Sequence, residues 1–210
     1  SEMCIRDRPF GDQHAGARAL ALDDRIGDEG GAVDDRGYLR DRAALALEQP
    51  LSVAFLGPEG TYSQAAALKH FGQSAIPQGQ ASIHKVFRQV EERLCDYGVV
   101  PVENSTEGMV GQTLDCFLES PLQITGEIEL PVVHHLLAGR GAAQSDIQLI
   151  LGHEQALGQC RQWLDSHLPK VPREAVASNG EAARRAGVEA GVAGIAGELA
   201  AGLHQLDTLA

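Results

Sequence analysis

Short apolar runs alternate with segments of helical periodicity along most of this chain. Residues 52–56 form an apolar run closed by Gly57-Pro58, a pattern typical of a buried strand. In residues 82–94 the apolar side chains recur three and four positions apart, which predicts an amphipathic helix. The same criteria predict strands at 97–102, 148–151, near 175–177 and at 192–196, helices at 61–71, near 110–118, at 154–165, 180–190 and 198–206, and one long extended segment at 123–137.

This alternation of strands and helices predicts the fold class. Strands that alternate with helices form a mostly parallel sheet covered on both faces. The extended segment at 123–137 is long enough to carry the chain from one lobe to another. We therefore predict an α/β fold of two small lobes, the first at about 52–125 plus 197–210 and the second at about 130–195.

Residues 1–42 differ in character from the rest. This stretch has no Lys, is rich in Asp, Arg and Gly, and sustains neither the strand nor the helix period. Such a composition buries too little apolar surface to offset the entropy lost on ordering. We predict a disordered or artefactual segment, and the first eight residues resemble an assembly or frame-shift scar.

Composition and charge exclude several classes of function. The 17 Lys and Arg against 29 Asp and Glu give a formal net charge of -12, which argues against a nucleic-acid partner. No apolar run reaches the roughly 18 residues of a membrane span, and we expect no signal peptide. The four cysteines lie far apart without a C-x-x-C pair, a usage typical of a reducing compartment. We expect a cytoplasmic protein.

The turn at residues 57–63 is the first candidate site. Its glycines allow close backbone approach, and the helix that follows offers N–H groups for an anion. Gly60, Thr61 and Ser63 are the candidate donors. The alternative is a plain strand-to-helix turn in which Thr61 caps the helix.

A second candidate site follows the strand at 97–102. Glu103, Asn104, Ser105, Thr106 and Glu107 stand in a row where ligands of open α/β sheets bind. Helix capping explains only some of these five polar residues, so a site and a capped helix both remain open.

The third candidate site lies in residues 152–160. His153-Glu154 suggests a zincin, but Leu157 stands where the second His would be, so we predict no metal. Gln159 lies at the edge of the apolar face and either points inward or is a solvated amide. We expect the neighbours His134 and His135 to point to opposite faces and to serve packing and surface roles.

A cap signature occurs later in the chain. Ser178-Asn179 before Glu181 is typical of a helix N-cap. We predict that these residues cap a helix unless their loop faces the cleft.

Taken together, residues 53–63, 98–108, 126–128 and 153–160 resemble the prephenate dehydratase family, and the resemblance extends from about Leu45 to Ala210. Residues 45–50 resemble the junction that follows the chorismate mutase helix in the bifunctional P-protein. The resemblance implies a two-lobe fold like that of type II periplasmic binding proteins, with the site in the cleft. It implies conversion of prephenate to phenylpyruvate, with loss of CO2 and water, for phenylalanine biosynthesis. It implies no cofactor, no metal and a homodimer.

The resemblance also assigns site residues. It implies catalytic roles for Glu103, Asn104 and Gln159. The residues expected to bind substrate are the hydroxyl, amide and backbone donors Gly60, Thr61, Ser63, Ser105, Ser178 and Asn179.

Three departures from the family pattern qualify the expected activity. The catalytic Thr-Arg-Phe motif is absent, and Thr208, followed by Leu209, does not replace it. Gly152 stands in place of the serine of S-H-P-Q, and residues 177–179 read Ala-Ser-Asn. We expect neither an ACT domain nor a working mutase in this chain. We expect a dehydratase truncated at its C-terminus; the alternatives are a non-catalytic module that binds a small carboxylate or amino acid, and a poorly folding fragment.

Overall fold

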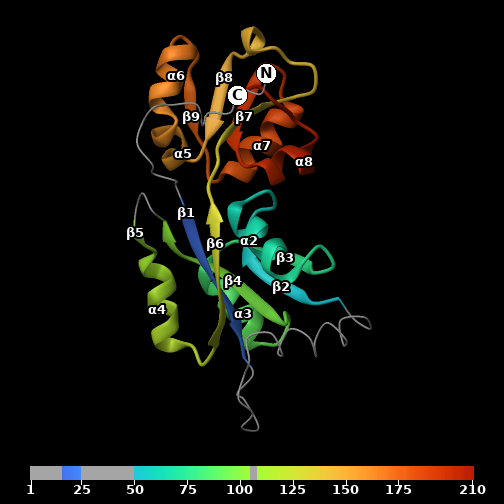
Figure 1. Ribbon diagram of the computed structural model, residues 1–210, viewed down its shortest axis with the longest axis vertical. Coiled ribbons are helices and arrows are strands. Elements are labelled where there is room, and N and C mark those ends of the chain that lie inside the picture. The colour runs from blue at the N-terminus through green and yellow to red at the C-terminus, as the bar shows by residue number, and fades with distance from the viewer. Residues whose placement is uncertain (1–15, 25–49, 105–107) are drawn as a thin grey trace. The chain divides into compact units, whose positions relative to one another are not determined.

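The computed structural model describes residues 16–24, 50–104 and 108–210 (Figure 1). These residues form two compact units. The first unit contains residues 17–24, 50–56 and 66–129, and the second unit contains residues 57–65 and 130–210. The chain passes from one unit to the other within helix α2 (Tyr62–Phe71) and within strand β6 (Gln123–Pro131).

A mixed sheet forms the centre of the first unit. Its strands lie in the order β3-β2-β4-β1-β6, and β5 pairs with the end of β4. Strands β3 and β4 run parallel to β2, whereas β1 runs antiparallel to β4. The bounds are β1 Gly16–Asp23, β2 Ser52–Leu56, β3 Ile76–Gln80, β4 Tyr97–Asn104 and β5 Gly108–Met109.

Helices bury both faces of this sheet. One face packs against α2 through Ala66, Ala67 and Phe71. The other packs against α3 (Ile83–Glu91) and α4 (Gly111–Glu119). Helix α3 begins at Ser82, whose side chain accepts a hydrogen bond from the Lys85 N–H. It buries four side chains on one face: Ile83, Val86, Phe87 and Val90.

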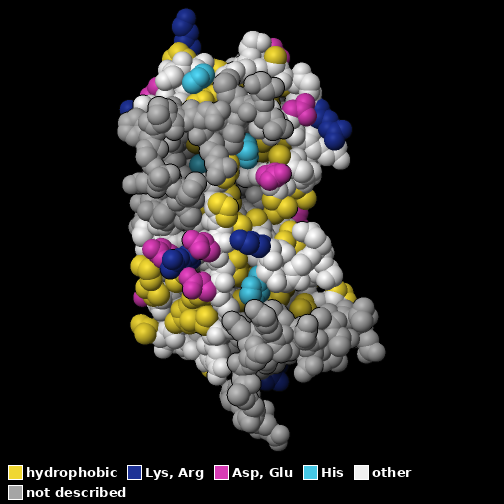
Figure 2. All heavy atoms as spheres, in the orientation of Figure 1, with side chains coloured by type: hydrophobic (Ala, Val, Ile, Leu, Met, Phe, Trp, Pro, Cys, Tyr) yellow, Lys and Arg dark blue, Asp and Glu magenta, His cyan; other side chains and the backbone are white. Residues whose placement is uncertain are grey.

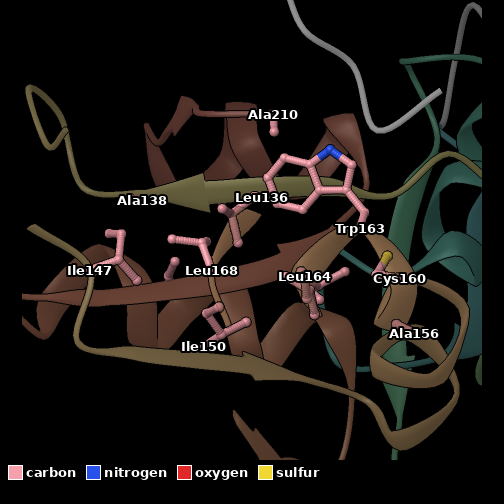
Figure 3. Close-up of a cluster of buried hydrophobic side chains, with 12 residues drawn as sticks. Leu136, Ala138, Ile147, Ile150, Ala156, Cys160, Trp163, Leu164, Leu168 and Ala210 are labelled. Atoms are coloured by element: carbon pink, nitrogen blue, oxygen red, sulfur yellow. The ribbon is translucent and has the colours of Figure 1, made fainter. Parts of the chain in front are cut away.

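The second unit contains a five-stranded sheet in the order β11-β7-β10-β8-β9. Helices α5 and α6 cover one face, where their side chains join the core cluster in Figure 3. Helices α7 and α8 cover the other face. The bounds are β7 His135–Ala138, β8 Leu149–Gly152, α5 Glu154–Gln159, α6 Arg161–His167, β9 Arg173–Ala175, α7 Asn179–Val188, β10 Val192–Ala196, α8 Glu198–His204 and β11 Asp207–Thr208, with a 3-10 turn at Gln144–Asp146.

The structure confirms an α/β fold but corrects the sheet type. Antiparallel pairs occur in both units, so the sheets are mixed and not mostly parallel. One cause is β1, which lies inside the segment predicted to have no structure. Leu22 and Ala21 of β1 are fully buried against β4, so this short alternation of Ala and Leu is ordered by a distant partner. Apart from Asp24, the rest of 1–42 lies outside the described residues.

Other segments differ from the predictions for local reasons. Strand β3 was not predicted, because Pro77 and Gly79 are typical of an edge strand and not of a buried apolar run. The extended segment 123–137 is two strands, since Pro131 lacks the N–H needed to extend β6. The helix 154–165 is two helices that meet at Cys160.

The end of the chain also differs from the predicted lobes. Residues 197–210 belong to the second unit, not to the lobe that contains β2, because β11 pairs with β7 and the Leu136 N–H donates to the Ala210 carbonyl. Within the described ranges no helix has the length and apolar character needed to cross a bilayer.

Candidate functional site

The turn that precedes α2 is held by its own hydrogen bonds. Gly60 adopts a φ of +79°, a conformation that glycine adopts without strain. Its N–H donates to Gln64 Oε1 at 2.7 Å. A Cβ at position 60 would lie 3.1 Å from the Ala200 Cβ, so this turn packs tightly on α8.

The hydroxyl of Thr61 also serves the turn. Thr61 Oγ1 donates to the Pro58 carbonyl at 3.0 Å, and the Thr61 carbonyl accepts the N–H of Ala65 at 3.1 Å. Ser63 is half-buried in the first turn of α2. The Gly60 N–H and the Thr61 O–H were both expected to donate to a substrate carboxylate. In this structure they donate to Gln64 of α2 and to the Pro58 carbonyl.

The start of α7 packs against the same turn. Ser178 accepts the Glu181 N–H at 3.1 Å, which confirms the predicted N-cap at this position. Asn179 Oδ1 accepts the N–H of His153 at 2.9 Å. Gly180 follows, and a Cβ there would overlap the Glu59 carbonyl oxygen. The turn 57–61, the β8–α5 loop and the start of α7 therefore form one packed cluster.

Gln159, at the end of α5, belongs to a chain of hydrogen bonds. Its Oε1 lies 2.7 Å from His134 Nε2. His134 Nδ1 lies 3.0 Å from the Tyr62 hydroxyl, which in turn lies 2.7 Å from the Val133 carbonyl oxygen. The next residue, Cys160, points into the apolar core in Figure 3, which fixes the end of α5 beside this network.

Burial shifts the pKa values of both rings in the network. Desolvation raises the pKa of Tyr62 well above its usual value, so the hydroxyl stays protonated. Desolvation lowers the pKa of His134 below 6.5, against the opposing effect of the hydrogen bond to Gln159. At neutral pH the network is therefore uncharged and consists of a phenol, a neutral imidazole and an amide.

A cavity of about 840 Å³ opens next to this network within the second unit. Residues 60–65, 130–135 and 197–203 contribute its walls. Thr61, His135 and Glu198 supply polar groups to walls that are otherwise largely apolar. Among the described residues, the buried His135 Nδ1 has no hydrogen-bond partner, and desolvation lowers the pKa of this ring although Glu198 opposes the shift.

Glu103 and Asn104 end strand β4 in the first unit. Arg18 of β1 lies beside them, with its Nη1 3.8 Å from the Glu103 carboxylate and 3.4 Å from that of Glu127. Figure 2 shows a place on the surface where a basic side chain lies among acidic side chains. These partly exposed ion pairs contribute little to stability. Ser105 lies outside the described residues.

The structure thus divides the expected site residues between the two units. Its second unit carries Gly60, Thr61, Ser63, Gln159, Ser178 and Asn179, and its first unit carries Glu103 and Asn104. The sequence pattern gave no role to Tyr62 and assigned His134 to packing or the surface; the second expectation is wrong, because His134 contacts both Tyr62 and Gln159. The adjacent polar rings at 134 and 135 were the only signal, since nothing local connects position 134 to position 159. Over the described ranges, no group of three or more His, Cys, Asp and Glu is placed to hold a metal ion.

Comparisons with known proteins agree with the motifs. Residues 53–210 match the family described as prephenate dehydratase. A bifunctional chorismate mutase/prephenate dehydratase of Pseudomonas aeruginosa is 55% identical over 167 residues, covering 80% of this chain and 46% of the relative. The chain therefore spans about half the length of the curated relatives it matches.

Solved structures show the same fold. The prephenate dehydratase of Arthrobacter aurescens in complex with L-Phe is 29% identical with a TM-score of 0.66, covering 76% of this chain and 55% of that one. GqqA, described as a novel type of quorum quenching acylase, is 24% identical with a TM-score of 0.69, covering 76% and 58%. At that identity the second likeness concerns the fold alone.

Proposed function

Because this chain belongs to the prephenate dehydratase family, we propose that it carries out the dehydratase reaction, which converts prephenate to phenylpyruvate. Prephenate loses its ring carboxylate as CO2 while the C–O bond at ring position 4 breaks. The electron pair of the C–C bond completes the aromatic ring, and the departing oxygen takes up a proton to leave as water. This balance needs no oxidant or reductant.

The protein's task in this reaction is to hold the substrate and to assist the leaving hydroxyl. A hydrogen-bond or proton donor at that oxygen is typically worth about 10²–10⁴-fold in rate. We assign catalytic roles to Glu103, Asn104 and Gln159, with Asn104 and Gln159 as the groups that orient substrate. Gly60, Thr61, Ser63, Ser105, Ser178 and Asn179 are the proposed binding residues. Of these, Ser178 and Asn179 also hold the start of α7 in place.

One observation carries most weight for Gln159. Its amide oxygen lies 2.7 Å from His134 Nε2, so the imidazole restrains the amide plane next to the half-buried Tyr62. An amide held in this way is preorganised, and it keeps its orientation when a substrate binds. Gln159 is exposed, as the alternative of a solvated amide predicted, and the contact with His134 is what distinguishes it from a free surface amide.

The proposal extends to the cell and the assembly. We expect the reaction in the cytoplasm and the complete enzyme to be a homodimer, which light scattering of the purified protein tests. A non-catalytic module that binds a small carboxylate is not favoured, because the family matched and the curated relatives carry dehydratase names.

Phenylpyruvate formation from prephenate tests the proposal. The assay compares this chain, the Pseudomonas aeruginosa relative as positive control, and a chimera that continues the chain past Ala210 with the corresponding residues of that relative. Turnover by the chain or by the chimera supports the proposal. Folded protein of both forms without turnover, beside an active relative, contradicts it.

A further inference from the structure

Strand β4 carries an irregularity just before its last two residues, which belong to the proposed catalytic set. Arg18 of β1 lies opposite Glu103. The next residue of β1, Ala19, lies opposite Pro101, so Val102 is an extra residue between two pairs and forms a β-bulge. A bulge changes which side chains of a strand share a face, and bulges are over-represented next to active sites.

Two hydrogen bonds join this bulge to the start of α4. The Val102 carbonyl accepts the N–H of Val110, the residue that precedes α4, at 2.9 Å. The Pro101 carbonyl accepts the hydroxyl of Thr113, in the first turn of α4, at 2.6 Å. Proline has no N–H, and within sheets it is confined to edges, strand starts and bulges. Both carbonyls of the bulge are thus bonded to the start of a helix that packs on this face of the sheet.

The burial of Thr113 shows that its hydroxyl serves this connection. Thr113 is fully buried. A buried hydroxyl costs free energy unless it is hydrogen-bonded, whereas a valine would fill the same space without that cost. Threonine hydroxyls in helices commonly bond a carbonyl three or four positions earlier in the same helix. The hydroxyl of Thr113 instead bonds a strand carbonyl 12 positions away, so it ties α4 to the bulge of β4.

We propose that Thr113 is a positioning residue for the dehydratase reaction: its hydroxyl holds the bulge that sets the direction in which Glu103 and Asn104 leave β4. This inference rests on the proposed function, which places both residues in the catalytic set. Without the hydroxyl, the end of β4 can return to regular pairing, and a shift of one residue turns each side chain beyond it to the opposite face. A catalytic group that holds its direction only part of the time stabilises the transition state less, so the loss falls on kcat.

Two substitutions at Thr113 test this role in the form of the protein, chain or chimera, that turns over prephenate. Thr113→Val keeps the shape of the side chain and removes the hydroxyl, and we expect kcat to fall by about tenfold with KM within about twofold. Thr113→Ser keeps the hydroxyl and should restore most of kcat. Thr125→Val is the matched control, with kcat unchanged, because the Thr125 hydroxyl also donates to a strand carbonyl, that of Ala21, away from the end of β4.

An NMR measurement on the chain itself reports on the end of β4 without turnover. The chain has two asparagines, Asn104 and Asn179, so 15N-asparagine labelling provides one reporter in each unit. In Thr113→Val the backbone amide signal of Asn104, identified by its loss in Asn104→Ala, should shift or split, because the bulge no longer has a single arrangement. The signal should keep its position in Thr113→Ser and Thr125→Val, and the signal of Asn179 should not move in any of these variants.

The inference requires both results. A merely structural role would lower the thermal midpoint of Thr113→Val and leave kcat of the folded protein unchanged. Full kcat, or an unmoved Asn104 signal, in folded Thr113→Val therefore overturns the inference. If Thr113→Val does not fold, Thr113→Ala, which places no methyl group against the Pro101 carbonyl, takes its place with the same expectations. Absence of turnover in both the chain and the chimera would defeat the proposed function, and the Asn104 signal would then decide whether Thr113 holds the end of β4.

Discussion

Asn179 accepts the backbone N–H of His153 through its side-chain Oδ1, at 2.9 Å. This bond joins the first residue of α7 to the loop that connects β8 to α5. The two residues are 26 positions apart, and each stands at the beginning of a helix. The hydrogen bond therefore sets how these two helices begin at one edge of the second sheet.

Replacement of Asn179 by Ala should destabilise the protein. The half-buried His153 N–H loses its acceptor, at a cost of about 1–2 kcal/mol in the free energy of unfolding. Urea unfolding of Asn179→Ala and Asn179→Asp measures this, since Asp retains the acceptor oxygen and should lie close to the parent. Equal loss in both variants would mean that this hydrogen bond does not contribute.

Gly180→Ala should be among the more damaging substitutions in α7. The new Cβ would overlap the carbonyl oxygen of Glu59, so the turn 57–61 must move at a cost of about 1–3 kcal/mol. Gly187→Ala, in the same helix, is the matched control because a Cβ there meets only ordinary contacts, the nearest at 3.5 Å. It should be neutral or stabilising by up to about 1 kcal/mol. The thermal midpoints of the two variants test this, and we expect that of Gly180→Ala to be the lower. Similar midpoints would contradict the prediction.

Asn104→Ala tests the part of the proposed site at the end of β4. We expect kcat for phenylpyruvate formation to fall by about two orders of magnitude, as for the loss of an orienting contact in the transition state. The thermal midpoint should change little. Gln123→Ala, at an exposed position of β6 in the same unit, is the control. Near-normal turnover in Asn104→Ala would remove Asn104 from the proposed catalytic set.

Gln159→Glu separates the two ends of the amide. The carboxylate keeps an oxygen within reach of His134 Nε2, but a second oxygen replaces the NH2 group of the amide. We expect turnover to fall by at least about 10²-fold, because a donor is lost and a negative charge meets a dianion. Circular dichroism should show an intact fold. Retention of activity would indicate that the NH2 group has no role in the reaction.

Three half-buried histidines, His70, His134 and His135, predict that stability depends on pH at values above those at which carboxylates titrate. Desolvation lowers the pKa of His70 below 6.5, and its ring packs against Phe71 with a centroid distance of 4.8 Å. The unfolded chain therefore binds protons more readily, so stability is complete above pH 6.5 and falls as the pH drops below it. His134 and His135 shift in the same direction.

Thermal midpoints measured at about pH 7.5 and 5.5 test this effect. Both pH values lie above the pKa of Glu181, which the hydrogen bond from Arg184 holds below 4.5, so this carboxylate does not titrate between them. We expect the midpoint to fall at the lower pH, and to fall less in His70→Gln, which does not titrate. A drop of the same size in His70→Gln would show that His70 does not contribute.

Local pattern predicted the elements whose signal lies within their own residues. The helix α3 has its apolar side chains at helical spacing and a serine cap, and β2 is a continuous apolar run, so both lie close to where the pattern places them. The resemblance to the family likewise needed only the order and spacing of motifs along the chain. These features depend on contacts between near neighbours, and the sequence displays them directly.

Long-range pairing decided the rest. Strand β1 is a weak alternation of Ala and Leu that becomes a strand because β4 supplies its hydrogen bonds and burial. The Gly60 N–H, a candidate anion donor by sequence, is engaged by Gln64 because the turn closes on itself. His134 and Gln159, 25 positions apart, form a network only after β7 and α5 pack into one unit. The sequence alone thus determined residue types, periodicity and family, whereas tertiary structure decided which donors and acceptors meet, because hydrogen bonds depend on distances that sequence separation does not express.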